Sequence, residues 1–149
     1  MNETLDRKER RLLDKCQSID ELYEQYAKKF GLTYMSLTVL ECIYDNKEAC
    51  TQKIIAETTR YPKQSVNLII KSFYEQGYIK LAEIASDRRN KKIVLTKKGN
   101  AYLDKIILPL WKIDETATET IANDDRETFL KCIDLYEKSF RLQIENLMK

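Results

Sequence analysis

Residues 51–99 constrain the fold of this chain more than any other part, because three different patterns follow one another there with little room between them. One short amphipathic stretch ends at Tyr61-Pro62, a second begins directly after the proline, and a charged, strand-like stretch follows. In the second stretch one helical face is marked by apolar residues at steps of three, four and seven: Val66, Ile69, Ile70 and Phe73. This order predicts two short helices that are joined by a tight turn and followed by a β-hairpin.

The opposite face of the second predicted helix carries mainly polar side chains at the same spacing. Gln64, Asn67 and Lys71 lie there together with Leu68. Glutamine and asparagine side chains can hydrogen-bond to the edge of adenine in a major groove. The predicted hairpin tip, residues 86–92, concentrates lysine and arginine where a wing would meet phosphate. Helix, turn, helix and basic wing are the layout of a DNA-reading module.

Charge is divided unevenly along the sequence, although the formal net charge of the whole chain is only +2. Residues 47–98 contain 12 Lys/Arg and 5 Asp/Glu, a net charge of +7, so the rest of the chain carries −5. A basic segment on an acidic scaffold favours a polyanionic partner. Lysine-rich surfaces are also common where the charge is simply solvated, so charge alone leaves both interpretations open.

The remaining sequence predicts four further helices. Apolar residues recur at three- and four-residue steps over about residues 5–30, 33–46, 98–111 and 124–147. A chain of 149 residues with three glycines and 34% charged residues fits one mostly helical domain with few loops. We therefore expect a mainly α fold with a small β-hairpin wing, in which residues 33–97 form the winged helix-turn-helix module.

Several residues mark where these helices should begin and end. Gly31 should end the first helix, and Thr33 and Thr51 should cap the two helices that follow them. Pro109 falls inside the helix after the hairpin and should kink it. The sequence Asp124-x-x-Glu127 resembles a capping box and should open the last helix.

The terminal segments, residues 1–30 and 98–149, carry long apolar stripes that the central module does not need for its own small core. The last predicted helix keeps a near-heptad repeat almost to the C-terminus. A chain of this size has little surface with which to cover both stripes. A second copy that supplies a partner helix is the simplest solution and gives a two-fold homodimer, whose symmetry would match a palindromic DNA site. The alternative is that the stripes pack against one another in a monomer.

Five short motifs in this order give the chain a resemblance to a known family over essentially its full length. They are Thr51-Gln52, Lys63-Gln64-Ser65-Val66, Glu75-Gln76-Gly77-Tyr78-Ile79, Asp87-Arg88-Arg89 and Leu95-Thr96-Lys97-Lys98-Gly99. The chain resembles the MarR family of winged helix-turn-helix transcriptional regulators. Two departures are Ala85-Ser86 in a wing that is often longer or richer in glycine, and Arg60 in the interhelix turn, where glycine is frequent.

The resemblance implies a homodimer that binds palindromic double-stranded DNA, usually as a repressor, with the helix at 62–76 in the major groove and the wing arginines near the minor groove. Gln64 and Asn67 are then candidates for base edges, and Lys63 and Lys71 for phosphates. Asp87 is expected to orient a neighbouring arginine by ion pairing. The candidate DNA-binding residues are Thr51, Gln52, Lys63, Gln64, Ser65, Asn67, Lys71, Asp87, Arg88, Arg89 and Lys91.

The resemblance also implies a small aromatic effector, because family members commonly sense phenolic or other aromatic ligands between the dimer helices and the DNA-binding module. Tyr23, Tyr26, Tyr34 and Trp111 are candidates for lining such a crevice, although aromatic residues at helical spacing are often ordinary core residues. Peroxide-sensing relatives use a reactive cysteine in the first helix. Cys16 lies in that helix, so a redox-sensing regulator is an alternative.

The cysteines provide no metal-binding pattern, because they are scattered without a C-x-x-C pair and the chain has no histidine. Cys16 and Cys42 lie on apolar stripes and are expected to be small core residues, whereas Cys50 precedes a helix and is expected to be more exposed. We expect neither a metal ion nor a cofactor.

An enzyme is not expected, because the sequence has no Gly-rich phosphate loop, no G-x-S-x-G and no histidine base. A winged-helix module that binds another protein is the other alternative, although the +7 segment favours DNA. No apolar run approaches the ~20 residues that span a bilayer, and the N-terminus lacks the apolar stretch of a signal peptide. The sequence therefore predicts a cytoplasmic protein without a membrane partner.

Overall fold

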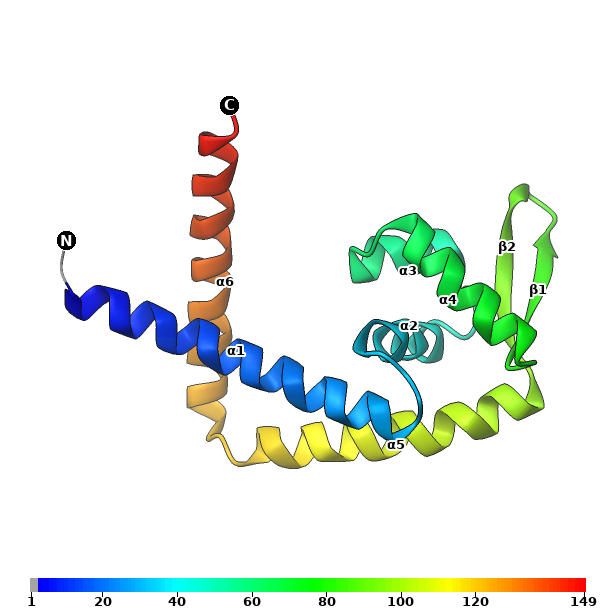
Figure 1. Ribbon diagram of the computed structural model, residues 1–149, viewed down its shortest axis with the longest axis horizontal. Coiled ribbons are helices and arrows are strands. Elements are labelled where there is room, and N and C mark those ends of the chain that lie inside the picture. The colour runs from blue at the N-terminus through cyan, green and yellow to red at the C-terminus, as the bar shows by residue number, and fades with distance from the viewer. Residues whose placement is uncertain (1–2) are drawn as a thin grey trace. The chain divides into compact units, whose positions relative to one another are not determined.

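The chain folds as six helices and one two-stranded hairpin (Figure 1), in a computed structural model that describes residues 3–149, with side chains from residue 11 onward except that of Arg88. The first compact unit ends at Pro109 and the second begins at Leu110. This is the mainly α fold with a β-hairpin wing that the sequence predicts. The elements are α1 (Glu3–Lys29), α2 (Tyr34–Asp45), α3 (Gln52–Thr59), α4 (Lys63–Glu75), β1 (Ile79–Ile84), β2 (Asp87–Leu95), α5 (Lys97–Glu119) and α6 (Asn123–Leu147).

The predicted helix caps are present in the first unit. Thr33 precedes α2 and its hydroxyl oxygen accepts the backbone N–H of Ser36 at 3.1 Å. Thr51 precedes α3 and accepts the N–H of Ile54 at 3.2 Å in the same way. Each threonine satisfies a donor that the first helical turn leaves unpaired, and such a cap contributes about 1 kcal/mol.

Two helices end at a glycine in the left-handed conformation. After α1, Gly31 has φ +72°, and its N–H and that of Leu32 donate to carbonyls of the last turn. After α4, Gly77 has φ +73° and Tyr78 donates to the carbonyl of Phe73 at 3.0 Å. Both ends are Schellman motifs, in which glycine takes a positive φ without steric cost. The chain therefore turns sharply from α1 to α2 and from α4 into β1.

The core of the first unit is built from one apolar face of each of its helices and from the inner face of the hairpin. Helix α2 packs against α1, α3 and α4, and β1 and β2 pack against α4 and α3 respectively. Tyr26 of α1 donates its hydroxyl to the carbonyl of Ile106 in α5 at 2.7 Å, which ties these two helices together. The largest fully buried side chains are Leu37, Val39, Leu40, Ile43, Ile55, Val66, Ile70, Ile79, Ile93, Leu103, Ile106 and Ile107.

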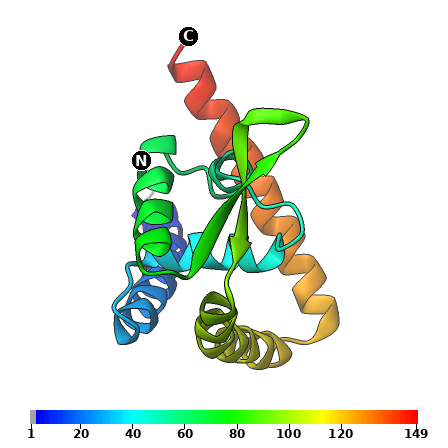
Figure 2. The same cartoon turned by 90° about the vertical axis from the view of Figure 1, so that its right-hand side faces the viewer.

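The hairpin of β1 and β2 is antiparallel (Figure 2), and its residue pairing has one irregularity near the tip. The pairing is regular from Ile79 opposite Leu95 to Glu83 opposite Lys91, and then it shifts so that Ile84 faces Asp87. The turn itself is Ala85-Ser86. The predicted tip, residues 86–92, therefore lies mostly inside β2, where residues 88–90 form extra length in the strand.

The second unit begins within α5, directly after Pro109, so the boundary falls where the sequence predicts a disturbed helix. Proline removes one backbone donor inside a helix. The prediction of a capping box at Asp124-x-x-Glu127 is wrong: α6 begins at Asn123, its N-cap is Ala122, and no side chain caps it. Asp124 and Asp125 instead lie in the first turn, where carboxylates are favourable beside the positive end of the helix.

Helix α6 leaves its apolar residues on the surface of the protomer. All of residues 123–147 are described, and none of them is buried. Phe129 is 55% exposed, Phe140 56% and Leu147 84%. Among the described side chains of α1, the apolar residues Leu13 and Leu22 are also more than half exposed.

Two of the four cysteines do not lie where the sequence pattern indicates. Cys16 is exposed rather than buried, so its apolar spacing on α1 does not place it in the core. Cys50 is completely buried rather than exposed, and Cys42 is buried as expected. Burial, together with the neighbouring Cys42, raises the pKa of the Cys50 thiol to about 12, so this thiol remains protonated and unreactive at neutral pH.

Candidate nucleic-acid interface

Helix α4 separates its side chains into a buried face and an exposed face. Val66, Ile70 and Phe73 are at most 2% exposed and hold the helix on the core of the first unit. The opposite face presents Gln64 and Asn67, which are exposed. The same exposed face carries Lys63, Leu68 and Lys71, with Ser65 half-buried beside it. The helix therefore offers two amide side chains flanked by cations on a surface that does not contribute to the core.

The turn between α3 and α4 fixes the direction of α4. Arg60 has φ +59°, the left-handed conformation that glycine adopts most easily. Arginine thus takes the backbone shape that the usual glycine would provide, at a cost of order 1 kcal/mol. Pro62 lies at the N-cap of α4 with φ −56° and ψ 137°, directly before the first helical residue, Lys63. The turn is tight because both residues restrict the backbone.

The wing is attached to α3 as well as to its own partner strand. The N–H of Ile93 in β2 donates to the carbonyl of Cys50 at 2.8 Å, and Thr51 forms an isolated bridge with Lys92. Strand β2 is consequently paired on both edges near its middle. Thr51 has a structural role here, since it caps α3 and pairs with β2 at the same time. The hairpin is held in a fixed position relative to the N-terminus of α3.

The tip of the wing is organised by Asp87. Its carboxylate accepts the backbone N–H of Arg89 at 3.1 Å and the side-chain amide of Asn90 at 2.7 Å. These hydrogen bonds, led by that from Asn90, lower the pKa of Asp87 and keep it ionised. The carboxylate thus shapes the backbone of the bulge, whereas the sequence predicts that it pairs with an arginine side chain. Arg89 is exposed, and the side chain of Arg88 lies outside the described residues.

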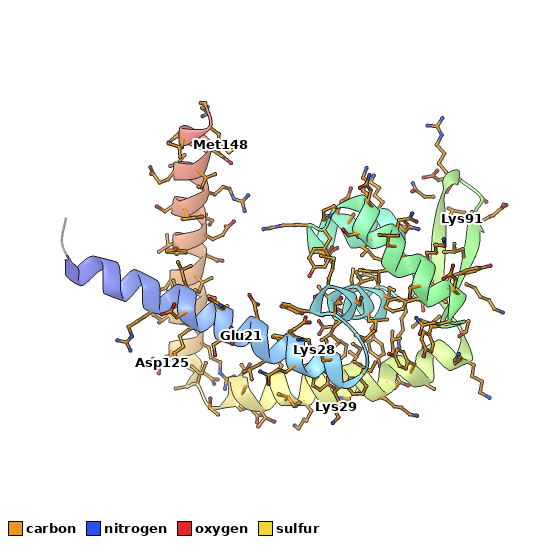
Figure 3. All side chains as sticks on the ribbon, in the orientation of Figure 1. Glu21, Lys28, Lys29, Lys91, Asp125 and Met148 are labelled. Carbon is orange, nitrogen blue, oxygen red and sulfur yellow. The ribbon has the colours of Figure 1, made fainter. Side chains whose placement is uncertain are left out.

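A polar cavity of about 450 Å³ lies where α3, α4 and the wing meet. Its lining consists of Gln52, Lys53, Lys63 and Asn90. All four side chains can donate hydrogen bonds, and two of them are cationic. Lys53 and Asn90 are absent from the set predicted by sequence. The sequence could have identified Lys53 as a candidate, because it lies two residues after Thr51, the cap of α3. It could not have identified Asn90, because the position of that side chain depends on the irregular register of the hairpin. Lys91 is exposed on the wing (Figure 3) and does not line this cavity.

A compact joint connects the end of α4, the start of the wing and the start of α5. Thr96 accepts the N–H of Gly99 at 2.9 Å and donates its hydroxyl to the carbonyl of Gly77 at 2.7 Å. The rings of Tyr78 and Tyr102 stack with centroids 4.2 Å apart. A Cβ atom on Gly99 would lie 1.9 Å from the carbonyl oxygen of Tyr78, so only glycine fits there. This joint fixes α4 and the wing to α5.

The aromatic residues predicted to line an effector crevice lie in different surroundings. Tyr23 and Tyr34 stack on each other, with ring centroids 5.3 Å apart. Tyr26 uses its hydroxyl to bind the carbonyl of Ile106. These three belong to the first unit, whereas Trp111 belongs to the second and is 41% exposed. Each tyrosine thus has a contact that an ordinary packing residue would have.

The structure brings most of the predicted DNA-binding residues to neighbouring elements of the first unit. Gln52 lies at the start of α3, and five of the predicted residues lie on α4. The wing carries Asp87, Arg88, Arg89 and Lys91. Thr51 lies between α3 and β2, to both of which it bonds. Among the described residues, no group of three His, Cys, Asp or Glu side chains is placed to hold a metal ion. None of the described helices has the length and apolar character required to cross a membrane.

Comparisons with known proteins agree with this architecture. Residues 30–90 match the model of the MarR family. The regulator NMB1585 of Neisseria meningitidis, a MarR family protein, is 24% identical with a TM-score of 0.76 and covers 98% of this chain and 99% of its own. AbsC of Streptomyces coelicolor, a MarR family transcriptional regulator, is 18% identical with a TM-score of 0.78 and covers 95% and 97%.

One of the similar structures was solved together with DNA. MepR of Staphylococcus aureus in a DNA complex is 16% identical with a TM-score of 0.70, covering 87% of this chain and 94% of its own. No curated protein sequence matches the chain. The low identities make these structures evidence for the fold, and the family model matches the segment that contains α2, α3, α4 and most of the wing. The resemblance found in the sequence is thus confirmed: residues 30–90 match the MarR family model, and the similar solved structures named above include MarR family regulators.

Proposed function

We propose that the protein is a repressor that binds a palindromic operator as a homodimer, with α4 in the major groove and the wing against the neighbouring backbone and minor groove. A small aromatic effector releases it. The observation that carries this proposal is the division of α4 into two faces. Val66, Ile70 and Phe73 hold the helix in place, while Gln64 and Asn67 are free of any role in the core.

Base reading is assigned to Gln64 and Asn67, because each can donate to and accept from an adenine edge. Lys63 and Lys71 lie on the same exposed face as these amides and contact phosphates, which fixes the register of the helix without reading sequence. Arg89 and Lys91 of the wing add further contacts with the backbone. The cavity lined by Gln52, Lys53, Lys63 and Asn90 is a place where one phosphate would meet donors from three elements.

The homodimer is supported by apolar residues of α6 that are exposed to solvent in the single chain. Five apolar residues follow one another along α6 at steps of seven, four, four and three residues, and all are at least 41% exposed: Phe129, Tyr136, Phe140, Ile144 and Leu147. A continuous exposed stripe of this kind marks an interaction surface. The second copy would cover the stripe and place two α4 helices for the two halves of a palindrome.

The test of base reading compares cognate with random duplex DNA. Asn67→Ala and Gln64→Ala should each cost about 1–3 kcal/mol of binding free energy on the operator and much less on random DNA, because only the base-edge contact is lost. Their melting temperatures should hardly change, since exposed substitutions usually alter stability by within ~0.5 kcal/mol. The operator is obtained by selecting tight binders from a pool of random duplexes.

Lys71→Ala is the matched control on the same face of α4. It should weaken binding to operator and random DNA alike, because a phosphate contact carries no sequence information. Equal losses on both duplexes for Asn67→Ala would make Asn67 a backbone contact. Folded variants of Gln64 and Asn67 that bind the operator as the wild type does would show that α4 does not read the groove, and the protein-binding alternative would then be preferred.

A further inference from the structure

Leu68 is an apolar side chain on the exposed face of α4. It is 68% exposed, whereas Val66, Ile70 and Phe73 on the buried face of the same helix are at most 2% exposed. Gln64 precedes Leu68 by one helical turn, so the two side chains are neighbours on one face. Leu68 therefore lies on the face to which base reading is assigned, and the core does not need it.

The exposure of Leu68 differs from that of the leucines on the terminal helix α1. Leu13 and Leu22 lie on a helix whose apolar face the proposed dimer would cover. Among the described side chains of residues 34–95, Leu68 is the most exposed large apolar one. Single exposed leucines are common on protein surfaces, so exposure alone assigns no role. The position of Leu68 among candidates for base contacts is what gives it one.

The neighbours of Leu68 on this face of α4 are polar. Gln64 lies four residues before it, Asn67 directly before it and Lys71 three residues after it, and all three are exposed. Side chains of a helix lean toward its N-terminus, so Leu68 covers the turn that begins at Gln64. One apolar group is thus placed between two amides and a lysine.

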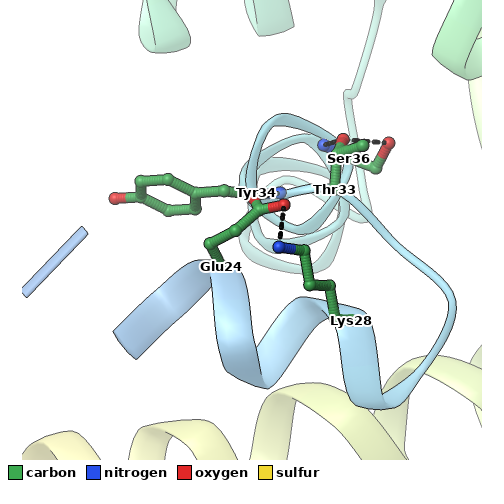
Figure 4. Close-up of polar contacts among 5 residues, drawn as sticks. All are labelled: Glu24, Lys28, Thr33, Tyr34 and Ser36. Carbon is green, nitrogen blue, oxygen red and sulfur yellow. Dashed lines mark hydrogen bonds and ion pairs between the residues drawn. The ribbon is translucent and has the colours of Figure 1, made fainter. Parts of the chain in front are cut away.

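The start of α2 borders the same cavity as Leu68 but does not cover it. Thr33 and Ser36 line this cavity together with Leu68. Their hydroxyl groups bond to each other at 3.0 Å (Figure 4). Glu24 of α1 accepts the backbone N–H of Tyr34 at 2.7 Å. The polar groups at this helix end are occupied within the protein, and Leu68 stays 68% exposed beside them.

The major groove of DNA presents one apolar group, the 5-methyl group of thymine, among hydrogen-bonding edges. The amides of Gln64 and Asn67 suit adenine edges, and every adenine is paired with thymine. A·T pairs beneath α4 therefore bring methyl groups to a side chain that lies beside these amides. Cytosine at the same place would turn its amino group toward leucine, which has no acceptor, and an unpaired buried donor is unfavourable.

We propose that Leu68 is a specificity-determining residue that contacts the 5-methyl group of a thymine in each half of the operator. The inference rests on the proposed function and deepens it, because it assigns A·T pairs to the part of the operator that α4 contacts. Gln64 and Asn67 read the adenines by hydrogen bonds, and Leu68 reads the methyl group by apolar contact. The three side chains together select thymine over cytosine without a further hydrogen bond.

Uracil is the matched probe, because it pairs with adenine as thymine does and lacks only the methyl group. Each thymine in one half of the selected operator is replaced in turn by uracil, and binding of the full-length protein is measured by fluorescence anisotropy. We expect one position at which the replacement weakens binding about fourfold, the effect of exposing one buried methyl-sized group. Replacement at thymines outside the α4 contact should leave the affinity unchanged.

Variants of α4 assign the methyl contact to one side chain. Leu68→Ala should bind the thymine and uracil operators equally, with an affinity close to that of the wild type on the uracil operator. Gln64→Ala is the matched control one turn away: it should bind the operator more weakly but keep the fourfold preference for thymine. Leu68→Met retains an apolar side chain and should retain most of the preference. Melting temperatures near that of the wild type establish that each variant is folded.

Cytosine and 5-methylcytosine provide a second pair that differs only in the methyl group. At the position identified with uracil, the wild type should prefer 5-methylcytosine over cytosine about fourfold, and Leu68→Ala should show no preference. The two pairs together separate the methyl group from the rest of the base.

Two results would overturn the role of Leu68. One is a wild type that binds every uracil-substituted operator as tightly as the thymine operator. The other is a folded Leu68→Ala protein that keeps the preference for the methyl group. A protein that binds no duplex tightly would instead refute the proposed function itself, whereas one that binds the operator and ignores the methyl group refutes only the reading by Leu68.

Discussion

The winged segment from α2 to β2 and the C-terminal helix α6 use apolar residues in opposite ways. In the winged segment each helix buries its apolar face, so that Leu40, Ile55 and Val66 have no exposed surface. In α6 the apolar residues are as regular, yet none of residues 123–147 is buried. The first region buries its apolar faces within one unit, whereas the periodic apolar face of α6 is exposed. A helix like this draws its stability mainly from packing, which in the proposed dimer a second copy of the chain would supply.

Truncating one phenylalanine in each region should affect stability very differently. Phe73→Ala should cost about 3–5 kcal/mol of the free energy of unfolding, because Phe73 is 2% exposed and its loss leaves a cavity. Phe140→Ala should cost little within a protomer, since Phe140 is 56% exposed. In the proposed dimer its effect should grow as the protein concentration is lowered, because it weakens association.

Chemical denaturation at two protein concentrations separates the two effects. The midpoint of Phe73→Ala should be lowered at both concentrations. The midpoint of Phe140→Ala should approach that of the wild type when both are dilute and monomeric. A loss of stability in Phe140→Ala that is as large as in Phe73→Ala and independent of concentration would mean that α6 is buried within its own chain.

A second prediction concerns the two glycines at either side of the wing. Gly99→Ala should destabilise the protein by about 3 kcal/mol, near the upper end for overpacking, because its Cβ would meet the Tyr78 carbonyl and the backbone must shift. Gly77→Ala meets no atom within 4 Å and should cost only about 1 kcal/mol for its positive φ. Thermal unfolding measures both. A larger loss of stability in Gly77→Ala than in Gly99→Ala would show that the joint between α4, the wing and α5 can make room for a Cβ atom at position 99.

A third prediction concerns the wing. Arg89→Ala should reduce the slope of log K against log salt by about 1 per subunit if the side chain contacts a phosphate. Arg89→Lys keeps the charge and should keep the slope. Affinity for random and cognate DNA should fall together in the alanine variant. A folded Arg89→Ala protein with an unchanged slope would place the wing outside the DNA interface.

The features that local sequence determines could be predicted, because they depend on spacing along a single element. The two faces of α4 follow from the positions of Val66, Ile70 and Phe73, and the caps at Thr33 and Thr51 depend on residues only three positions away. Features that depend on what covers a helix were not predictable. Cys16 has an apolar spacing but no neighbour over it, and Cys50 is buried because β2 pairs with it.

The residues of the candidate site also divide into those that local sequence predicts and those that depend on neighbouring elements. The exposed residues of α4 and the basic wing could be identified from sequence, since both patterns are local. The role of Asp87 could not, because the shift in the β1–β2 register brings the Asn90 amide to its carboxylate.

Sedimentation equilibrium at micromolar protein shows whether a second copy of the chain covers the apolar face of α6. The chain has a mass of 17.6 kDa. We expect a single species of twice this mass, which Phe140→Glu or Leu147→Glu shifts toward one chain by placing a charge on the apolar face. A wild-type protein that is fully folded and sediments as one chain of 17.6 kDa would contradict it.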